Sequence, residues 1–184
     1  VSQATLRIVK VFWGLSAALA YKRHFPAVDW LVSYSLYADK MGDWYAENIG
    51  DEFLTLRAEA IKLLQESAGL EEIVRLVGVD SLSDRDKLTL ETAKSLREDF
   101  LHQNAFHEVD TYASLEKQFK LLKLIMVYHS CALEALGRGV EFGFVIIPEL
   151  RAKIGRAKYI AEADMKEING IESEIKTRLA ALTA

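Results

Sequence analysis

Apolar residues recur along most of this chain at the spacing of an α-helix. The clearest stripe runs through residues 115–137, where apolar positions alternate in steps of four and three. This spacing puts the side chains on one face of a helix, and a second apolar set beside the stripe predicts burial on a broad face. Similar patterns predict helices over residues 51–67, 70–77 and 84–101, and Gly78 fits a C-terminal stop of the second.

The pattern is weaker between and after these helices. Residues 103–114 are polar, and we predict a loop there. Residues 142–147 form a short apolar patch before a proline, and a narrower stripe over residues 162–182 predicts a last helix with a solvated outer face. Ser83 and Asp86 resemble a capping box, in which a Ser side chain and an acidic residue three positions later satisfy the first backbone donors of a helix.

The N-terminal part has a different pattern. Residues 6–13 are β-branched, aromatic and roughly alternating, which is typical of a strand. We expect Gly14 to end this strand and a short helix to follow as far as His24. Residues 29–41 place apolar and aromatic side chains at helical spacing, and residues 42–51 indicate a turn with a short helical piece. The predicted fold class is therefore mainly all-α, a helical bundle with one β-strand at its N-terminus.

The composition is that of a folded domain. The chain has 184 residues, of which 51% are hydrophobic, and these values predict one domain with a sizeable core. Its formal net charge of −4 lacks the basic footprint of nucleic-acid binding, so we expect no nucleic-acid partner. Cys131 is the single cysteine, which excludes an internal disulfide. No apolar stretch approaches the roughly 20 residues of a membrane span, so we expect no membrane insertion.

The chain offers little chemistry of its own. Its ten glycines include no phosphate-binding G-x-x-x-x-G-K-[ST] motif, so we expect no catalytic residues. The densest set of metal-ligand types comprises His102, His107, Glu108 and Asp110. Their spacing matches no metal template, and we expect loop hydrogen bonds and no metal ion. His129 falls within an apolar stripe, where we expect a core histidine with satisfied hydrogen bonds.

Two aromatic residues stand outside the apolar stripes. Phe25 precedes Pro26 at the expected end of a short helix, and Phe106 lies within the polar loop. A ring in a loop serves either as a tether into the core or as a stacking platform for a planar ligand such as a base. The residues alone leave both interpretations open.

The segments around these two rings resemble a known family. Residues 24–30, H-F-P-A-V-D-W, resemble the R-H-F-P-A-[IV]-[ND]-W segment of the catalytic A subunit of archaeal-type and vacuolar-type rotary ATP synthases. Residues 101–112 resemble its F-L-Q-Q-N-A-F-H-E-V-D-T-Y stretch, residues 10–13 its K-V-F-W strand, and residues 73–80 a further segment. Four separated blocks in the same order make the resemblance specific, and it covers residues 2 to about 160.

The resemblance implies a division of the chain. Residues 1–26 would be the last strand and helix of an incomplete nucleotide-binding domain, and residues 27–184 a helical C-terminal domain. The phosphate-binding lysine, the magnesium-binding Thr and the catalytic Glu of the family belong to an upstream part. The parent subunit is thus expected to be an enzyme and this chain alone to be inactive.

The resemblance also implies an adenine site. Phe25, Ala105 and Phe106 are expected to form its wall, with secondary contacts from Gln103 and Asn104. ATP or ADP with Mg is the expected ligand of the intact subunit. Stacking on a ring is worth about 1–3 kcal/mol per base, whereas a millimolar complex already needs about 4 kcal/mol. We therefore predict that the chain alone binds no nucleotide tightly and takes ATP in the millimolar range or weaker.

A second implied site is a loop that faces the rotating central stalk, by alignment with the related β subunit of the F-type enzyme. The loop comprises Asp80, Ser81, Leu82, Ser83, Asp84, Arg85 and Asp86. Residues 79–99 contain six acids and four bases, so this region is only weakly acidic. The implied partners are the B subunits of the hexameric head and the stalk subunits, with the head cytoplasmic and peripheral to the membrane. Stalk rotation would swing the helical body about residues 25–29 and couple ATP synthesis or hydrolysis to ion transport.

The alternative is a stand-alone helical interaction module or scaffold without catalysis. The strand predicted at residues 6–13 discriminates the two, because a free-standing helical protein has no use for a lone apolar strand with an unpaired edge. A piece of a longer subunit would carry such a strand by accident. A first residue other than Met also leads us to expect a fragment or a processed product.

Overall fold

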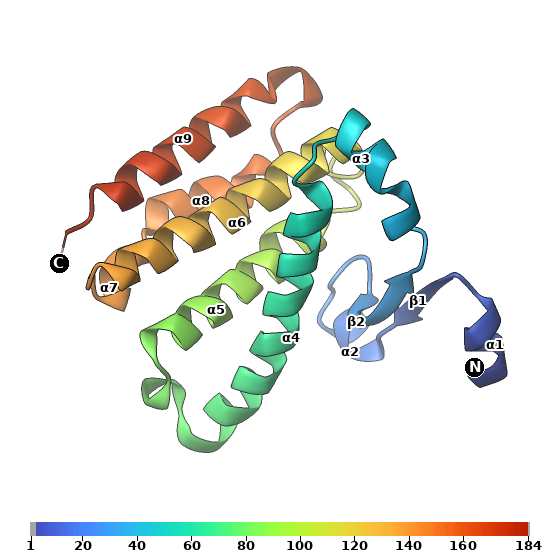
Figure 1. Ribbon diagram of the computed structural model, residues 1–184, viewed down its shortest axis with the longest axis horizontal. Helices are drawn as coiled ribbons and strands as arrows, with labels where there is room; N and C mark the ends of the chain where they lie inside the picture. The colour runs from blue at the N-terminus through green and yellow to red at the C-terminus, as the bar shows by residue number, and fades with distance from the viewer. Residues whose placement is uncertain (1–2, 184) are drawn as a thin grey trace.

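The computed structural model describes residues 3–183 and is built mainly from helices (Figure 1). The N-terminal part contains α1 (Gln3–Ile8), β1 (Val11–Leu15), α2 (Ala17–Tyr21) and β2 (Val28–Ser35). The middle contains η1 (Asp39–Met41), α3 (Gly42–Asn48), α4 (Phe53–Val77), η2 (Val79–Ser81), α5 (Asp84–Ser95) and the π-helical η3 (Leu96–Leu101). The last part contains α6 (Leu115–Gly137), α7 (Phe142–Val145), α8 (Pro148–Ala157), η4 (Glu162–Asp164) and α9 (Lys166–Ala180).

Helix α6 is the centre of the hydrophobic core. It contacts α4, α5, α8 and α9, which surround it (Figure 1). Its buried apolar residues cover a broad face: Leu121, Leu122, Leu124, Ile125, Met126, Tyr128, Ala132 and Ala135. Burial of each Leu or Ile side chain contributes about 1.5–3 kcal/mol relative to exposure, so this helix supplies much of the free energy of folding. The predictions of a helix over residues 115–137 and of a loop before it are confirmed.

The helix hairpin of α4 and α5 ends where its sequence signals predict. Gly78 caps α4 with a φ of 87°, a left-handed conformation that glycine adopts without a steric penalty. The Ser83 Oγ accepts a hydrogen bond from the Asp86 backbone N–H at 3.2 Å, which caps α5. The same hydroxyl donates to the Asp86 carboxylate at 2.7 Å. The predicted cap is therefore present.

Two helices differ from their predicted extents. The patterns at residues 51–67 and 70–77 belong to the single helix α4, which runs through Gly69 without a break. No helix was predicted over residues 148–157, where α8 lies. A proline is tolerated in the first turn of a helix, because the N–H that it lacks has no intrahelical partner there. Pro148 therefore begins a helix as well as ending the apolar patch before it.

The N-terminal part differs most from the prediction. Residues 6–13 are not one strand, because α1 occupies the first of them and β1 begins at Val11 and continues past Gly14. The helix predicted over residues 29–41 is wrong, since residues 28–35 form β2. The apolar and aromatic residues of this segment satisfy a helical spacing and a strand equally well, and antiparallel pairing with β1 decides between them.

Gly14 is required by the close approach of the two strands. It lies opposite Asp29 in the ladder, and its N–H donates to the Ser33 hydroxyl at 3.0 Å. A Cβ at this position would clash with the Val32 side chain. The ladder is irregular between Phe12 and Gly14, which marks a bulge where glycine is commonly found.

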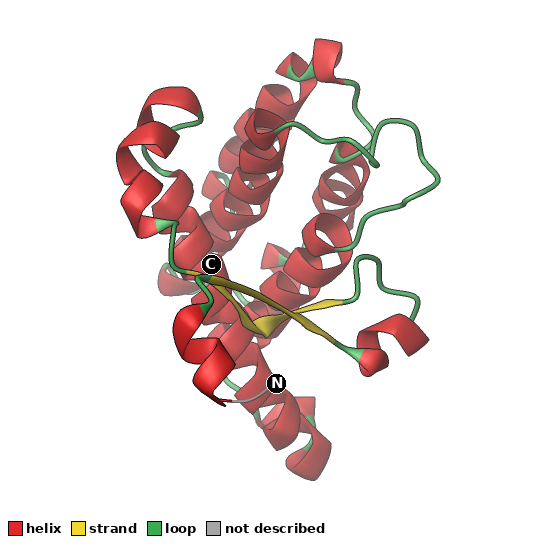
Figure 2. Ribbon diagram, turned by 90° about the vertical axis from the view of Figure 1, so that its right-hand side faces the viewer, coloured by secondary structure: helices red, strands yellow, loops and turns green. Residues whose placement is uncertain are grey.

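The small sheet packs beside the helical body (Figure 2). Strand β2 contacts α4, and Trp30 packs against the main core. The mainly all-α fold class with β-structure at the N-terminus is thus confirmed, although the strand has a partner. That pairing weakens the lone-strand argument against a stand-alone module. The division of the chain after residue 26 stays a prediction. Within residues 3–183, no helix has both the length and the apolar character that crossing a membrane requires.

Candidate functional site

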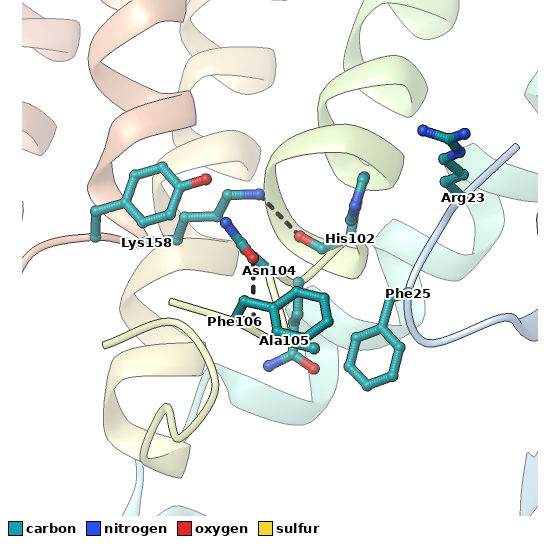
Figure 3. Close-up of a pocket in the computed structure, with 9 residues that line it drawn as sticks. Arg23, Phe25, His102, Asn104, Ala105, Phe106 and Lys158 are labelled. Carbon is teal, nitrogen blue, oxygen red and sulfur yellow. Dashed lines mark hydrogen bonds between the residues drawn. The ribbon is translucent and has the colours of Figure 1, made fainter. Parts of the chain in front are cut away.

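One pocket brings together the five residues that the family resemblance assigns to an adenine site (Figure 3). Its volume is about 480 Å³. Its lining consists of Arg23, Phe25, His102, Gln103, Asn104, Ala105, Phe106, Lys158 and Tyr159. These residues come from three segments that are far apart in the chain: the turn after α2, the loop after η3, and the end of α8.

The first two segments are joined by their backbones. The Gln103 N–H donates to the Phe25 carbonyl at 2.7 Å, which ties the loop after η3 to the turn after α2. Arg23 adopts a φ of 57°, in the left-handed region, at the point where the chain reverses after α2. The position of Phe25 relative to Phe106 is thus set by main-chain contacts between the two segments.

Both aromatic rings are available to a ligand. Phe106 is 99% exposed and Phe25 is 51% exposed. Figure 3 shows the two rings as neighbours on one side of the pocket. An exposed ring cannot anchor a loop in the core, so the tether interpretation is wrong for Phe106. The stacking interpretation remains, because an open aromatic face is what a planar base packs against.

A buried carboxylate holds the loop that carries Phe106. Asp110 is 3% exposed, and its Oδ2 accepts the Asn104 N–H at 2.6 Å. The Asp110 carbonyl accepts the side-chain amide of Gln103 at 3.3 Å, and the Asn104 Oδ1 accepts the Phe106 N–H at 3.1 Å. The Thr111 hydroxyl contacts the Ala105 carbonyl at 3.1 Å. The polar loop is therefore held in place by hydrogen bonds among its own residues.

Two lysines that the sequence did not single out support the floor of the pocket. The Lys158 Nζ donates to the His102 carbonyl at 2.8 Å and to the Glu98 carbonyl at 3.2 Å. Lys117 is fully buried, and its Nζ donates to the Lys158 carbonyl at 2.8 Å. Burial lowers the Lys117 pKa, and the nearby acids Glu162 and Asp110 oppose that shift. Neither lysine lies in a recognisable motif, so no sequence signal points to them.

The candidate metal ligands serve the loop instead. Asp110 accepts the backbone bond described above, and the His107 Nδ1 accepts the Val109 N–H at 3.2 Å. The His107 ring also lies 4.5 Å from the Tyr159 ring. Among residues 3–183, no three His, Cys, Asp or Glu side chains are grouped to hold a metal ion.

The expectation of a satisfied core histidine is confirmed for His129. Its Nδ1 lies 2.7 Å from the Thr92 hydroxyl, which itself donates to the Leu88 carbonyl. Because a hydroxyl has one proton to donate, the Nδ1 is the donor toward Thr92. Burial, helped by the positive charge of Arg85, lowers the His129 pKa to about 4.

The predicted stalk loop lies far from the pocket. It forms the turn between α4 and α5, whereas the pocket loop follows η3 at the other end of α5 (Figure 1). Its side chains are exposed, apart from the partly buried Asp86 and from Leu82, which is buried at 9% exposure. Leu82 therefore anchors the loop, and the remaining residues are accessible to a partner.

Comparisons with known proteins identify the family of this chain. A family described as the C-terminal domain of V and A type ATP synthase matches residues 42–141. The V-type ATP synthase alpha chain of Thermoanaerobacter pseudethanolicus is 56% identical over 182 residues, which cover 99% of this chain and 31% of that protein. The alpha chain of Clostridium botulinum is 59% identical over 175 residues, 95% of this chain and 30% of that protein.

A solved structure agrees with these relatives. The ATP synthase subunit NeqB from Nanoarcheaum equitans aligns with a TM-score of 0.56 and 26% identity, over 68% of this chain and 29% of that one. The matched family covers more than half of the chain, so the chain belongs to the V- and A-type ATP synthase family. Within that family it carries the C-terminal domain of the alpha chain. It spans about a third of the length of the curated relatives.

Proposed function

We propose that this chain supplies the adenine-facing wall of the nucleotide site in a V-type ATP synthase alpha chain. One observation carries the proposal: two exposed rings, Phe25 and Phe106, line a single pocket although about eighty residues separate them in the chain. An exposed ring stacks on any base, so these rings orient the adenine. The phosphates and the Mg ion that accompany ATP or ADP would be held by other parts of the intact subunit.

The polar lining agrees with this role. Gln103 and Asn104 line the pocket beside the rings. Their backbone N–H groups, the Gln103 amide N–H and the Asn104 Oδ1 bond within the protein. The Gln103 Oε1 and the Asn104 amide N–H are left to offer an acceptor and a donor to the edge of a base. The pocket is open to solvent and its rings stand free, so the chain alone binds ATP weakly. The affinity of the intact subunit comes mainly from its phosphate contacts.

The proposal extends to coupling. Helices α5 and η3 join the predicted stalk loop to the pocket loop over 18 residues, a length of about 27 Å. Rotation of a central stalk against the loop would move this helical body and open or close the pocket, with a hinge near residues 25–29. The partners are then the B subunits and the stalk subunits of a head peripheral to the membrane, which couples ATP synthesis or hydrolysis to ion transport.

The adenine wall is tested by replacing Phe106 in an assembled ATP synthase head whose alpha chain contains this sequence. Loss of a base–ring stack of about 1–3 kcal/mol raises the KM for ATP about 5-fold to 150-fold. Phe106→Ala is expected to show this rise and Phe106→Trp to retain a low KM. Tyr112→Ala is the matched control, because Tyr112 is 84% exposed near the same loop but does not line the pocket. An unchanged KM in Phe106→Ala would contradict the adenine wall.

A further inference from the structure

His24 lies in the turn that carries Phe25 and contacts η3, the helix that precedes the loop of Phe106. Its Nδ1 is 3.2 Å from the Pro26 carbonyl oxygen, and its Nε2 is 3.0 Å from the Arg97 carbonyl oxygen. Both partners are carbonyl groups, which accept hydrogen bonds and never donate them. A neutral imidazole has a single N–H, so only the doubly protonated ring satisfies both contacts.

The neighbouring histidine favours this assignment. The His102 ring lies 5.0 Å from the His24 ring. The His102 pKa is lowered, first by burial and then by the positive charges of His24 and Lys158. Two adjacent imidazoles resist carrying two charges. Because His102 is biased toward the neutral form, His24 is free to hold the proton of the pair.

Other charged groups surround the pair on every packed element. The cations are Arg23 beside the pocket, Arg97 on η3 and Lys158 at the end of α8, and the anions are Glu98 on η3, Asp110 in the loop and Glu71 on α4. Glu71 pairs with the Arg97 guanidinium at 3.0 Å, which offsets the charge of Arg97. Cations and anions are thus mixed around the ring, and its two carbonyl partners supply directed stabilisation of the imidazolium.

The Arg97 carbonyl is where the helix gives way to the pocket loop. It accepts the His102 N–H at 3.0 Å, the five-residue bond that makes this turn π-helical. His24 binds the same oxygen from the other segment. Together with the bond from Gln103 to the Phe25 carbonyl, it holds the turn after α2 against the end of η3. The spacing between Phe25 and Phe106 depends on these few bonds.

We propose that His24 is a positioning residue which, when doubly protonated, bridges the two walls of the pocket and holds their rings at the separation that an adenine nucleotide requires. The inference rests on the adenine wall proposed above. It adds that the geometry of this wall depends on the protonation state of His24. The Nε2 bond to Arg97 crosses between the walls, and the Nδ1 bond to Pro26, within the turn that carries His24, orients the ring for it. Loss of the second proton leaves a nitrogen lone pair facing one of these carbonyl oxygens, which destabilises the ring orientation and loosens the bridge. ATP binding therefore weakens at a pH high enough to remove this proton.

The test measures KM and kcat for MgATP between about pH 6 and pH 8.5, the range in which histidine titrates. It uses the assembled head with the wild-type alpha chain, His24→Gln and His24→Asn. Wild-type KM is expected to rise about three-fold to ten-fold across this range, which is the net worth of one ordinary hydrogen bond, while kcat changes less than two-fold. The amide of His24→Gln keeps a donor toward Arg97 but cannot titrate, so its KM is intermediate and independent of pH.

The controls separate this inference from the adenine wall. His107→Gln removes another histidine of the pocket region that does not bridge the two segments, and it should keep the wild-type pH profile. His24→Asn is expected to give the same KM at every pH. It replaces His24→Gln in the test if the Gln variant does not assemble. A KM in the His24 variants that follows pH as in wild type overturns the inference. If Phe106→Ala raises KM while the His24 variants match wild type, the adenine wall stands and the His24 inference alone fails.

Discussion

At the scale of single residues, the loop after η3 reverses the usual distribution of polar and apolar side chains. Phe106 is almost wholly exposed, while the carboxylate of Asp110 is buried. A buried charge is costly unless hydrogen bonds compensate it, and here a backbone N–H and the loop around it do so. An exposed ring on a loop ordered in this way keeps its surface for a ligand, since it contributes little to folding.

His129 makes stability depend on pH. Its folded pKa of about 4 lies below the ordinary value of 6.5, so the unfolded chain binds more protons than the folded chain between these two values. The stabilising effect is complete above pH 6.5 and is lost as the pH falls toward 4, by about 3 kcal/mol in total. Urea unfolding at pH 7 and at pH 4.5 measures this loss.

The non-titrating variant His129→Gln isolates the effect. It should be less stable than wild type at pH 7, where it lacks the native packing, but its stability should fall less between pH 7 and pH 4.5. The other three histidines are present in both proteins, so their contributions cancel in the comparison. Equal losses of stability in the two proteins would mean that His129 is not held neutral.

At the scale of elements, helices and strands differ in how locally they are specified. Helix α6 follows from its own stripe and from Ser114, whose Oγ accepts the Lys117 N–H at 3.1 Å as an N-cap. Strand β2 is not specified by its own sequence pattern, because its apolar residues also fit a helical spacing. Only the ladder with β1 selects the extended form. The same holds for the π-helical η3 that continues α5, where His24 binds the carbonyl of Arg97 and Lys158 that of Glu98.

Two glycines should respond oppositely to the same substitution. Gly14→Ala places a Cβ against Val32 in the ladder, and overpacking of this kind destabilises by about 1–3 kcal/mol. Gly69→Ala meets no atom within 4 Å, and in the interior of helix α4 it should stabilise by about 0.5–1 kcal/mol. Thermal unfolding of the two variants and of the wild type measures whether each substitution lowers or raises the stability. A neutral Gly14→Ala would show that β1 and β2 adjust their spacing freely.

At the scale of the whole molecule, one helical body carries two separate surfaces. The pocket and the turn between α4 and α5 lie at opposite ends of α5, and α6 packs along this body as its core (Figure 1). A body of this kind transmits a displacement from one end to the other without a contiguous polar pathway, because packed helices move together.

Coupling should not depend on the acids of the predicted stalk loop. Asp80 and Asp84 are exposed, and Asp84 already pairs with Lys87 at 3.4 Å. Exposed ion pairs contribute about 1 kcal/mol or less, which corresponds to a factor of about five, so Asp80→Asn with Asp84→Asn should change ATP-driven rotation of the assembled head less than about five-fold. Glu59→Gln with Glu66→Gln is the matched control, with the same charge change on α4 outside the loop. Lost rotation with retained ATP hydrolysis in the loop variant alone would show that charge carries the contact.

The amino-acid sequence by itself determined the helical class, the position of α6 and the caps at Gly78 and Ser83. Each of these depends on a local pattern, since helix periodicity and capping act over a few residues. The two aromatic segments of the pocket were indicated by the resemblance to the ATP synthase family, because their local pattern left their role open. Only the tertiary structure decided that residues 28–35 form a strand, that Phe106 is exposed, and that His24 and Lys158 reach the loop. These features depend on contacts between segments far apart in the chain, and no local pattern encodes such contacts.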